Sequence, residues 1–194
     1  EDYRKLIHGA MHQTFCAIPQ AKAIQDFPID EKTVVLGPKP QRVSNVGNKD
    51  QDKILFSKVL SKAFGGLTSL ETSIEPSEKE ITEVLEATKQ ASSIILGTYN
   101  AHTHLGQKKL LKALEQSGKK LLVVALRNPY DLMEVEKGNP AIAIYEYSEK
   151  ALQTLISCLK GEQLASGTLP VAPTKTALLY GLLKPFLGSY TEHF

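Results

Sequence analysis

Two short polar segments carry the side chains best suited to chemistry, and each follows an apolar run. His102-x-His104 follows the run at residues 93–96, and Asn128-Pro129-Tyr130-Asp131 follows the run at residues 121–126. Two imidazoles separated by one residue could bind a metal ion, but no third ligand is evident nearby. We therefore expect a solvated loop at the two histidines, and no metal site.

Asp131 and Glu146 are the acids that we considered for catalysis. Asp131 lies beside a predicted helix start, where a carboxylate is favoured by about 0.3–1 kcal/mol, so we interpret it first as a helix-terminus acid. Glu146 stands between Tyr145 and Tyr147. A lone acid there could donate a proton, but such acids are more often surface residues. Motifs alone therefore predict no catalytic residue.

Other reactive motifs are missing or isolated. The glycines form neither Gly-x-Gly-x-x-Gly nor a P-loop, which argues against the usual nucleotide sites, and we expect no cofactor. No Gly-x-Ser-x-Gly elbow is present, which excludes the α/β-hydrolase interpretation. Cys16 and Cys158 are the only cysteines and both lie in apolar patterns, so we expect buried, inert thiols rather than a disulfide framework.

Composition excludes several classes of protein. The 194 residues suit one domain with appendages, and 42% hydrophobic with 23% charged residues is typical of a globular protein. A net charge of +2 without a basic block argues against a nucleic-acid partner. No apolar run approaches the roughly 18 residues that a membrane span requires. No signal-like segment is present at the start of the sequence. Because the sequence starts at Glu1 and not at a methionine, we expect a processed chain or a fragment, and a cytoplasmic or secreted location stays open.

Short apolar runs alternate with amphipathic segments along most of the chain. Strands are predicted at residues 14–18, 33–36, 67–74, 93–96, 121–126 and 141–145. Helices are predicted between them, except at residues 21–30, which we expect to be irregular. Ser77 is expected to cap one helix, with Glu80 reaching back to form a capping box, and Ser148 is expected to cap another.

This alternation is the signature of β-α-β units. We predict an α/β fold, specifically a three-layer α/β/α sandwich with five or six mostly parallel strands, flavodoxin-like in type. Residues 121–126 should form a central strand, because they are apolar on both faces. The domain is expected at residues 14–173, preceded by a linker or helix of another domain at 1–13 and followed by a helical tail at 174–194. Residues 38–52 should form a long polar loop.

The carboxyl ends of parallel strands share one edge of a sheet, where ligands and partners usually bind. Tyr99, Tyr130, Tyr145 and Tyr147 all fall at predicted strand exits. They could form an aromatic rim for a partner domain or a sugar ring, or they could close the end of the sheet as partly buried side chains.

Several blocks resemble a known family in their order along the chain. Val124-Ala125-Leu126-Arg127-Asn128-Pro129-Tyr130-Asp131-Leu132 is followed by Ala141-Ile142-Ala143-Ile144-Tyr145-Glu146-Tyr147-Ser148, then by Gly161-Glu162 and Gly167-Thr168-Leu169-Pro170-Val171. This order is similar to the C-terminal domain of family 3 glycoside hydrolases, especially the two-domain β-N-acetylhexosaminidases. The resemblance covers residues 14–171.

The resemblance implies an accessory α/β sandwich that follows a (β/α)8 barrel, its partner. The barrel would hydrolyse N-acetylglucosamine-containing glycans, and the sandwich would support it. In that family the barrel carries the Asp nucleophile and, in the hexosaminidase branch, a His general acid on a Lys-His-x-x-Gly-His-Gly loop. Neither is present here, so no catalytic residue is carried over, and Glu146 is only the best positional counterpart of the acid/base Glu of the β-glucosidase branch. The side chains expected to dock on the barrel or border its cleft are Asn100, Asn128, Tyr130, Asp131, Glu146 and Tyr147.

Two other functions stay open at this point. The chain could be a stand-alone module that binds a sugar or another small molecule without catalysis. It could also be a structural or oligomerising domain that uses the leucine-rich residues 177–187 as its contact.

Overall fold

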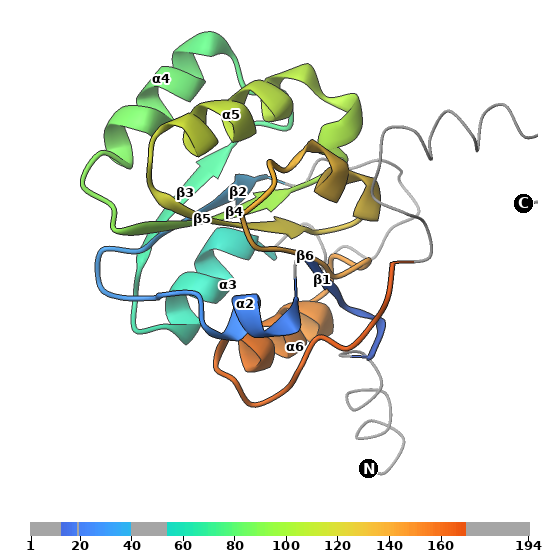
Figure 1. The fold of residues 1–194 in the computed structure, drawn as a ribbon. Helices are drawn as coiled ribbons and strands as arrows, with labels where there is room; N and C mark the ends of the chain where they lie inside the picture. Colours follow the sequence, from blue (N-terminus) through green and yellow to red (C-terminus); the bar gives the residue numbers. More distant parts are fainter. Residues whose placement is uncertain (1–12, 19, 40–53, 170–194) are drawn as a thin grey trace, which may run out of the picture.

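The computed structural model describes residues 13–18, 20–39 and 54–169, and these residues form a sheet between two layers of helices (Figure 1). Six strands lie in the order β1-β6-β5-β4-β2-β3. Their bounds are β1 Cys16–Ile18, β2 Val34–Pro38, β3 Thr68–Thr72, β4 Ser93–Thr98, β5 Lys120–Ala125 and β6 Ala141–Ala143. Only β1 pairs antiparallel. From β3 to β6 the parallel strands follow the flavodoxin-like order, so the predicted fold class is confirmed.

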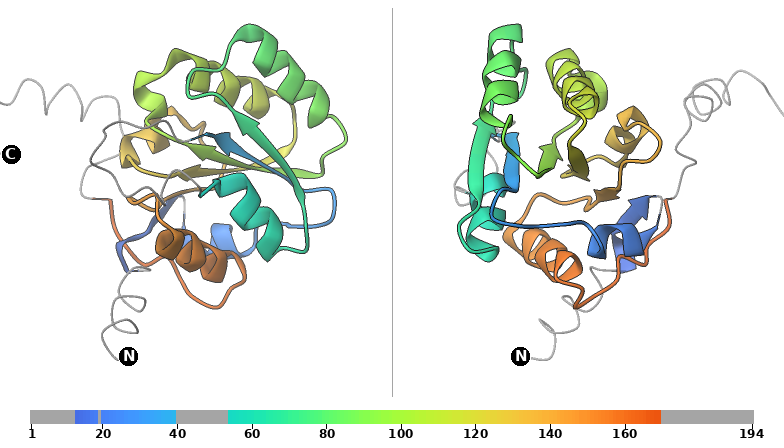
Figure 2. Two further views of the ribbon diagram at one scale, coloured as in Figure 1. Left: turned by 180° about the vertical axis from the view of Figure 1, so that it is seen from behind. Right: turned by 60° about the vertical axis from the view of Figure 1, so that its left-hand side comes forward.

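Helices cover both faces of the sheet (Figure 2). Helices α4 (Glu78–Ala87) and α5 (Leu105–Gln116) lie on one face, and α2 (Ala21–Gln25), α3 (Phe56–Ala63) and α6 (Glu149–Leu159) lie on the other. Two short 3-10 turns, η2 (Ala101–Thr103) and η3 (Pro129–Glu134), follow β4 and β5. Both turns therefore lie at the carboxyl ends of the parallel strands.

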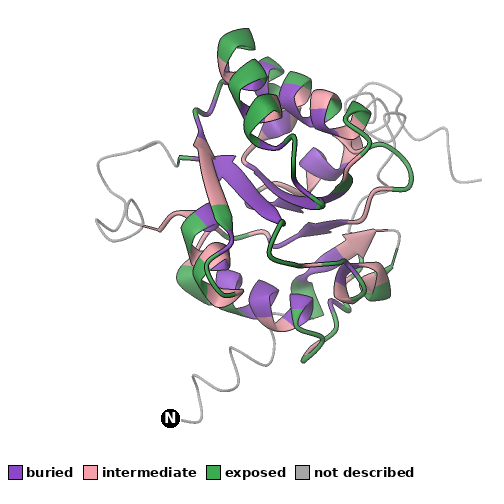
Figure 3. Ribbon diagram, turned by 90° about the vertical axis from the view of Figure 1, so that its left-hand side faces the viewer, coloured by how far each residue is buried: buried purple, intermediate pink, exposed green. Residues whose placement is uncertain are grey.

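Strand β5 lies inside the sheet, between β4 and β6. Its side chains alternate between two cores, because Leu121 and Val123 pack with α4 and α5, whereas Leu122 and Val124 pack with α3 and α6. All four are 0–1% exposed, and the inner strands of the sheet are buried, whereas the edge strand β3 is mostly of intermediate exposure (Figure 3). The predicted central strand is thus confirmed, because its apolar residues are buried on both faces as its sequence indicated.

Local structure departs from the predictions in three places. Residues 21–30 were expected to be irregular, but helix α2 forms there because Ile24 is buried in the core, although no side chain caps the helix. Ser77 accepts a hydrogen bond from the Glu80 N–H as predicted, but the Glu80 carboxylate accepts from Ser73, at 2.6 and 2.7 Å. The last strand ends at Ala143, because Tyr145 has a left-handed backbone.

Some predictions fall outside the described residues. These are the N-terminal helix before residue 13, most of the loop at 38–52, and the tail at 174–194. The proposed domain boundaries therefore remain predictions. In the part of the chain that the structure describes, no helix is long and apolar enough to cross a membrane.

Candidate binding site

The loops after β4, β5 and β6 leave the sheet side by side. The Leu126 N–H donates to the Thr98 carbonyl at 2.9 Å, and the Ile144 N–H donates to the Ala125 carbonyl at 3.1 Å. These bonds extend the parallel pairing beyond the last ladder residues, so side chains that are far apart in the sequence meet at this edge. We call this set of loops the carboxyl edge: residues 99–104, 126–131 and 144–147.

A histidine of the β4 loop is held by an aspartate of the β5 loop. Asp131 Oδ1 accepts from the His102 backbone N–H at 3.1 Å and lies 2.8 Å from the His102 ring Nδ1. Asp131 is fully buried, whereas the His102 side chain is 23% exposed and its ring lies 5.8 Å from the Tyr130 ring. Asp131 can therefore act on a partner only through His102.

A second pair runs in the opposite direction between the same loops. Arg127 of the β5 loop donates from Nη1 to the Tyr99 hydroxyl at 2.6 Å, and its guanidinium lies 5.6 Å from the centre of the Tyr99 ring. Tyr99 also makes an edge contact with Tyr147, with ring centres 6.2 Å apart. The loop after β5 thus positions His102 through Asp131, and the loop after β4 positions Arg127 through Tyr99.

Hydrogen bonds to buried groups fix the positions of Tyr99 and Tyr147. The Gln107 side chain is buried, accepts from the Tyr99 N–H, and donates to the carbonyls of Tyr99 and Ile74, each at 2.9 Å. The Tyr147 hydroxyl donates to the Ile54 carbonyl and accepts from the Phe56 N–H. Burial raises the pKa of Tyr147 to about 12, so its hydroxyl stays protonated at neutral pH.

The edge also carries backbone strain. In the described residues, the non-glycine residues with positive φ are Asn100, at 55°, and Tyr145, at 60°, directly after β4 and β6. Such conformations are uncommon for residues other than glycine, and strained residues concentrate at functional sites. The Tyr145 hydroxyl lies 3.1 Å from Cys16 Sγ, and burial, followed by this contact, raises the pKa of Tyr145.

The structure brings only part of the predicted set together. Tyr130 and Asp131 meet at His102, as described above, while Asn128 accepts from the Tyr130 N–H at 3.1 Å and so caps η3. Glu146 is exposed. Asn100 and Tyr147 belong to the same edge, but the role of all six residues in docking remains a prediction.

His102, Arg127 and Tyr99 were not among the six residues expected to dock, although Tyr99 was one of the tyrosines of the possible aromatic rim. His102 was expected in a solvated loop, and its neighbour His104 pairs instead with Glu75, at 2.9 Å. The two imidazoles therefore serve different carboxylates, and the described residues contain no group of three metal-ligating side chains. The sequence signal that could have indicated the His102–Asp131 pair was a histidine and an acid that follow two successive predicted strands.

A usual ligand position of this fold is filled by the protein itself. Flavodoxin-like sheets bind ligands where the strand order reverses, here between β2 and β4. Gly37 and Gly97 face each other there, and a Cβ on either would lie within 3.0 Å of the Phe56 ring. Phe56 is only 1% exposed, so this ring occupies the space over both glycines on the α3 face.

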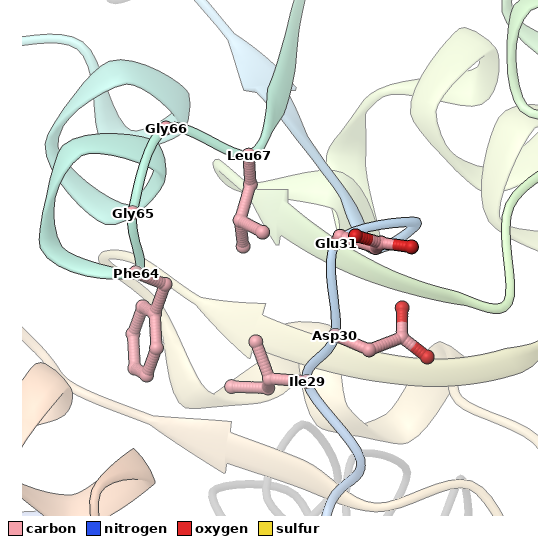
Figure 4. Close-up of a pocket in the computed structure, with 7 residues that line it drawn as sticks. All are labelled: Ile29, Asp30, Glu31, Phe64, Gly65, Gly66 and Leu67. Carbon is pink, nitrogen blue, oxygen red and sulfur yellow. The ribbon is translucent and has the colours of Figure 1, made fainter.

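One cavity of about 290 Å³ lies at the opposite edge of the sheet, before β2 and β3 (Figure 4). Ile29, Phe64 and Leu67 point toward one another there, and the carboxylates of Asp30 and Glu31 point away from them. Asp30 is already bonded to Ser92, which lowers its pKa. The cavity is therefore lined by apolar side chains, and the Asp30 carboxylate does not point into it.

Fold and edge together define a flavodoxin-like α/β/α domain with braced loops at the carboxyl ends of its strands. Solved structures of glycosidases, among them family 3 glycoside hydrolases, contain this fold. A β-N-acetylglucosaminidase from Paenibacillus sp. strain FPU-7 matches with a TM-score of 0.73 at 22% identity, over 90% of this chain and 33% of that chain. A β-glucosidase from Listeria innocua matches with a TM-score of 0.67 at 14% identity, over 87% and 27%.

A third match is the β-N-acetylglucosaminidase from Thermotoga maritima, with a TM-score of 0.55 at 13% identity, over 79% of this chain and 31% of that chain. This chain spans a third or less of the length of each of these three proteins. No family model matches the sequence. No curated protein matches it significantly. The resemblance to family 3 glycoside hydrolases is confirmed at the level of fold, which is that expected of their C-terminal domain.

Proposed function

We propose that the chain is the accessory C-terminal domain of a family 3 glycoside hydrolase and supports a (β/α)8 barrel that performs the hydrolysis. The observation that carries this proposal is the fold match, which takes in 90% of this chain but 33% of the Paenibacillus enzyme. A domain that corresponds to one part of a larger enzyme fits a supporting role. The absence of a catalytic motif in the sequence agrees with this role.

For the parent enzyme we propose a substrate that contains N-acetylglucosamine, cleaved with retention by two catalytic groups of the barrel. Two of the three structures described above are β-N-acetylglucosaminidases, and the sequence blocks resemble the same branch. The Listeria innocua match is a β-glucosidase, so the choice of sugar depends on the sequence resemblance as much as on the fold.

The carboxyl edge is the surface that we assign to docking or to the border of the cleft. It carries Asn100, Asn128, Tyr130, Glu146 and Tyr147, and Asp131 lies buried beneath it in contact with His102. Aromatic residues and arginine are enriched in protein interfaces, and this edge supplies both. Loops braced by hydrogen bonds also lose little conformational entropy on docking.

The coding region upstream of Glu1 gives the sharpest test of this proposal. We expect it to encode a barrel with an Asp nucleophile and, for the hexosaminidase branch, a histidine loop. If the full transcript encodes no barrel upstream of Glu1, the proposal is contradicted. Calorimetry on the isolated chain with sugars and nucleotides would then test the alternative, a stand-alone binding module.

A further inference from the structure

We propose that His102 and Arg127 form a binding site for the hydroxyl groups of a neutral sugar, with Asp131 and Tyr99 as their positioning residues. The site lies between the loops after β4 and β5. The choice of a sugar rests on the proposed function, whereas the choice of these residues rests on the two contacts between the loops, His102 with Asp131 and Arg127 with Tyr99.

His102 is the acceptor of this site because Asp131 fixes its proton. An ionised carboxylate can only accept hydrogen bonds. Since Asp131 Oδ1 lies 2.8 Å from Nδ1, Nδ1 carries a ring proton, and in the neutral form of the ring Nε2 presents a lone pair. Nε2 has no hydrogen-bond partner among the described residues, and the side chain is partly exposed.

Asp131 holds this tautomer firmly because it has no competing partner. The residue is 0% exposed, and both hydrogen bonds found for its carboxylate come from His102. Its other oxygen, Oδ2, has no partner among the described residues. A buried carboxylate without its partner is unfavourable, so the aspartate strongly favours the imidazole in its observed orientation.

Arg127 is the donor of the site. Its guanidinium has five N–H groups, and the hydrogen bond found for this side chain is the one to the Tyr99 hydroxyl. The side chain is exposed, yet the bond and the contact with the ring restrict where its charge can lie. The remaining N–H groups can therefore donate to a ligand with little additional ordering.

A sugar fits this pair better than an anion does. A hydroxyl group both donates and accepts, so neighbouring hydroxyls can satisfy the His102 lone pair and the Arg127 N–H groups together. A phosphate or carboxylate would bind Arg127, but beside the neutral form of His102 it would meet the Nε2 lone pair, with the Asp131 carboxyl group behind the ring. The rings of Tyr99 and Tyr130 add apolar surface beside these polar groups, as is usual in ligand sites.

His104 provides a matched control on the same loop. It also pairs through Nδ1 with a carboxylate, at 2.9 Å, but that carboxylate belongs to Glu75, which is 54% exposed. The two histidines thus differ mainly in the burial of their partner. Loss of His104 should leave sugar binding unchanged.

Nuclear magnetic resonance on the full chain tests this proposal. We expect methyl β-N-acetylglucosaminide to bind in the millimolar range and to shift the imidazole nitrogens of His102 and the Arg127 guanidinium. His102→Ala and Arg127→Ala should each weaken binding about tenfold, and His104→Ala should not. Asp131→Asn should change the nitrogen shifts of His102, reporting a changed proton position.

Three results would overturn the proposal. These are no shift at saturating sugar, equal weakening by His104→Ala, or binding of inorganic phosphate at the same residues in place of the sugar. Amide spectra of each variant establish that it is folded, and Arg127→Ala alters only an exposed side chain. Failure here leaves the accessory role standing, because that role depends on the upstream barrel and not on sugar binding by this chain.

Discussion

Asp131 shows how one buried residue organises the carboxyl edge. We expect Asp131→Ala to destabilise the protein by about 1–3 kcal/mol, because two N–H groups of His102 lose their acceptor. Urea unfolding followed by circular dichroism measures this change. Glu75→Ala is the matched control, and it should destabilise less because Glu75 is exposed. Equal effects of the two variants would contradict the role given to burial.

Both thiols should be unreactive in the folded protein. Cys16 and Cys158 are buried, and burial raises the pKa of Cys158 to about 11, so at pH 8 this thiol is almost wholly protonated. We expect Ellman's reagent to react slowly with the native protein and rapidly with the protein in urea. Rapid reaction of the native protein would show that at least one thiol is accessible.

Residues that act on their own neighbours were the ones most successfully predicted. Ser77 and Ser148 cap their helices through residues three positions away, as the local pattern indicated. The pairs at the site were not predictable in this way. His102 and Asp131 are 29 residues apart and Tyr99 and Arg127 are 28 apart, so their contact depends on which strands are neighbours.

At the scale of elements, the start of α5 is fixed against the loop after β3. A Cβ on Gly106 would lie 2.5 Å from the Pro76 carbonyl oxygen and 2.8 Å from the Pro76 nitrogen. Because these are backbone atoms, we expect Gly106→Ala to shift the helix and to destabilise the protein by about 1–3 kcal/mol in thermal unfolding. Gly118→Ala, whose added Cβ would meet nothing within 4 Å, is the control for backbone strain alone. A smaller loss for Gly106→Ala than for Gly118→Ala would contradict this account.

The exit of β4 depends on a single buried amide. Gln107→Leu should leave the Tyr99 N–H and the carbonyls of Tyr99 and Ile74 without their partner. We expect a loss of stability of about 1–3 kcal/mol and faster amide exchange at Tyr99, because unpaired buried groups are unfavourable. Exchange at Leu122, inside the sheet, serves as the internal control. Unchanged protection of Tyr99 would show that other contacts hold the loop.

Elements with a strong apolar pattern were predicted and weakly patterned ones were missed. The buried strands β2, β4 and β5 follow uninterrupted apolar runs. Helix α2 has five residues and one buried side chain, Ile24, so it offers too little periodicity to detect. The early end of β6 depends on the positive φ of Tyr145, which residue preferences argue against.

At the scale of the molecule, the alternation of strands and helices predicted the class of fold, but no strand was assigned its neighbours. Alternating strands and helices indicate a parallel sheet without saying which strands are neighbours. That order places β4 beside β5, and hence His102 beside Asp131. The candidate site therefore followed from topology, whereas the family resemblance supplied the expected partner.

If this chain supports catalysis by another domain, as we propose, the purified chain should not hydrolyse glycosides by itself. The assay measures release of para-nitrophenol from the β-N-acetylglucosaminide, β-glucoside and β-xyloside, beside a reaction without protein. The account predicts no turnover above that blank, and Glu146→Gln should leave the result unchanged. Turnover by the chain alone that is abolished by Glu146→Gln would contradict the account and identify Glu146 as catalytic.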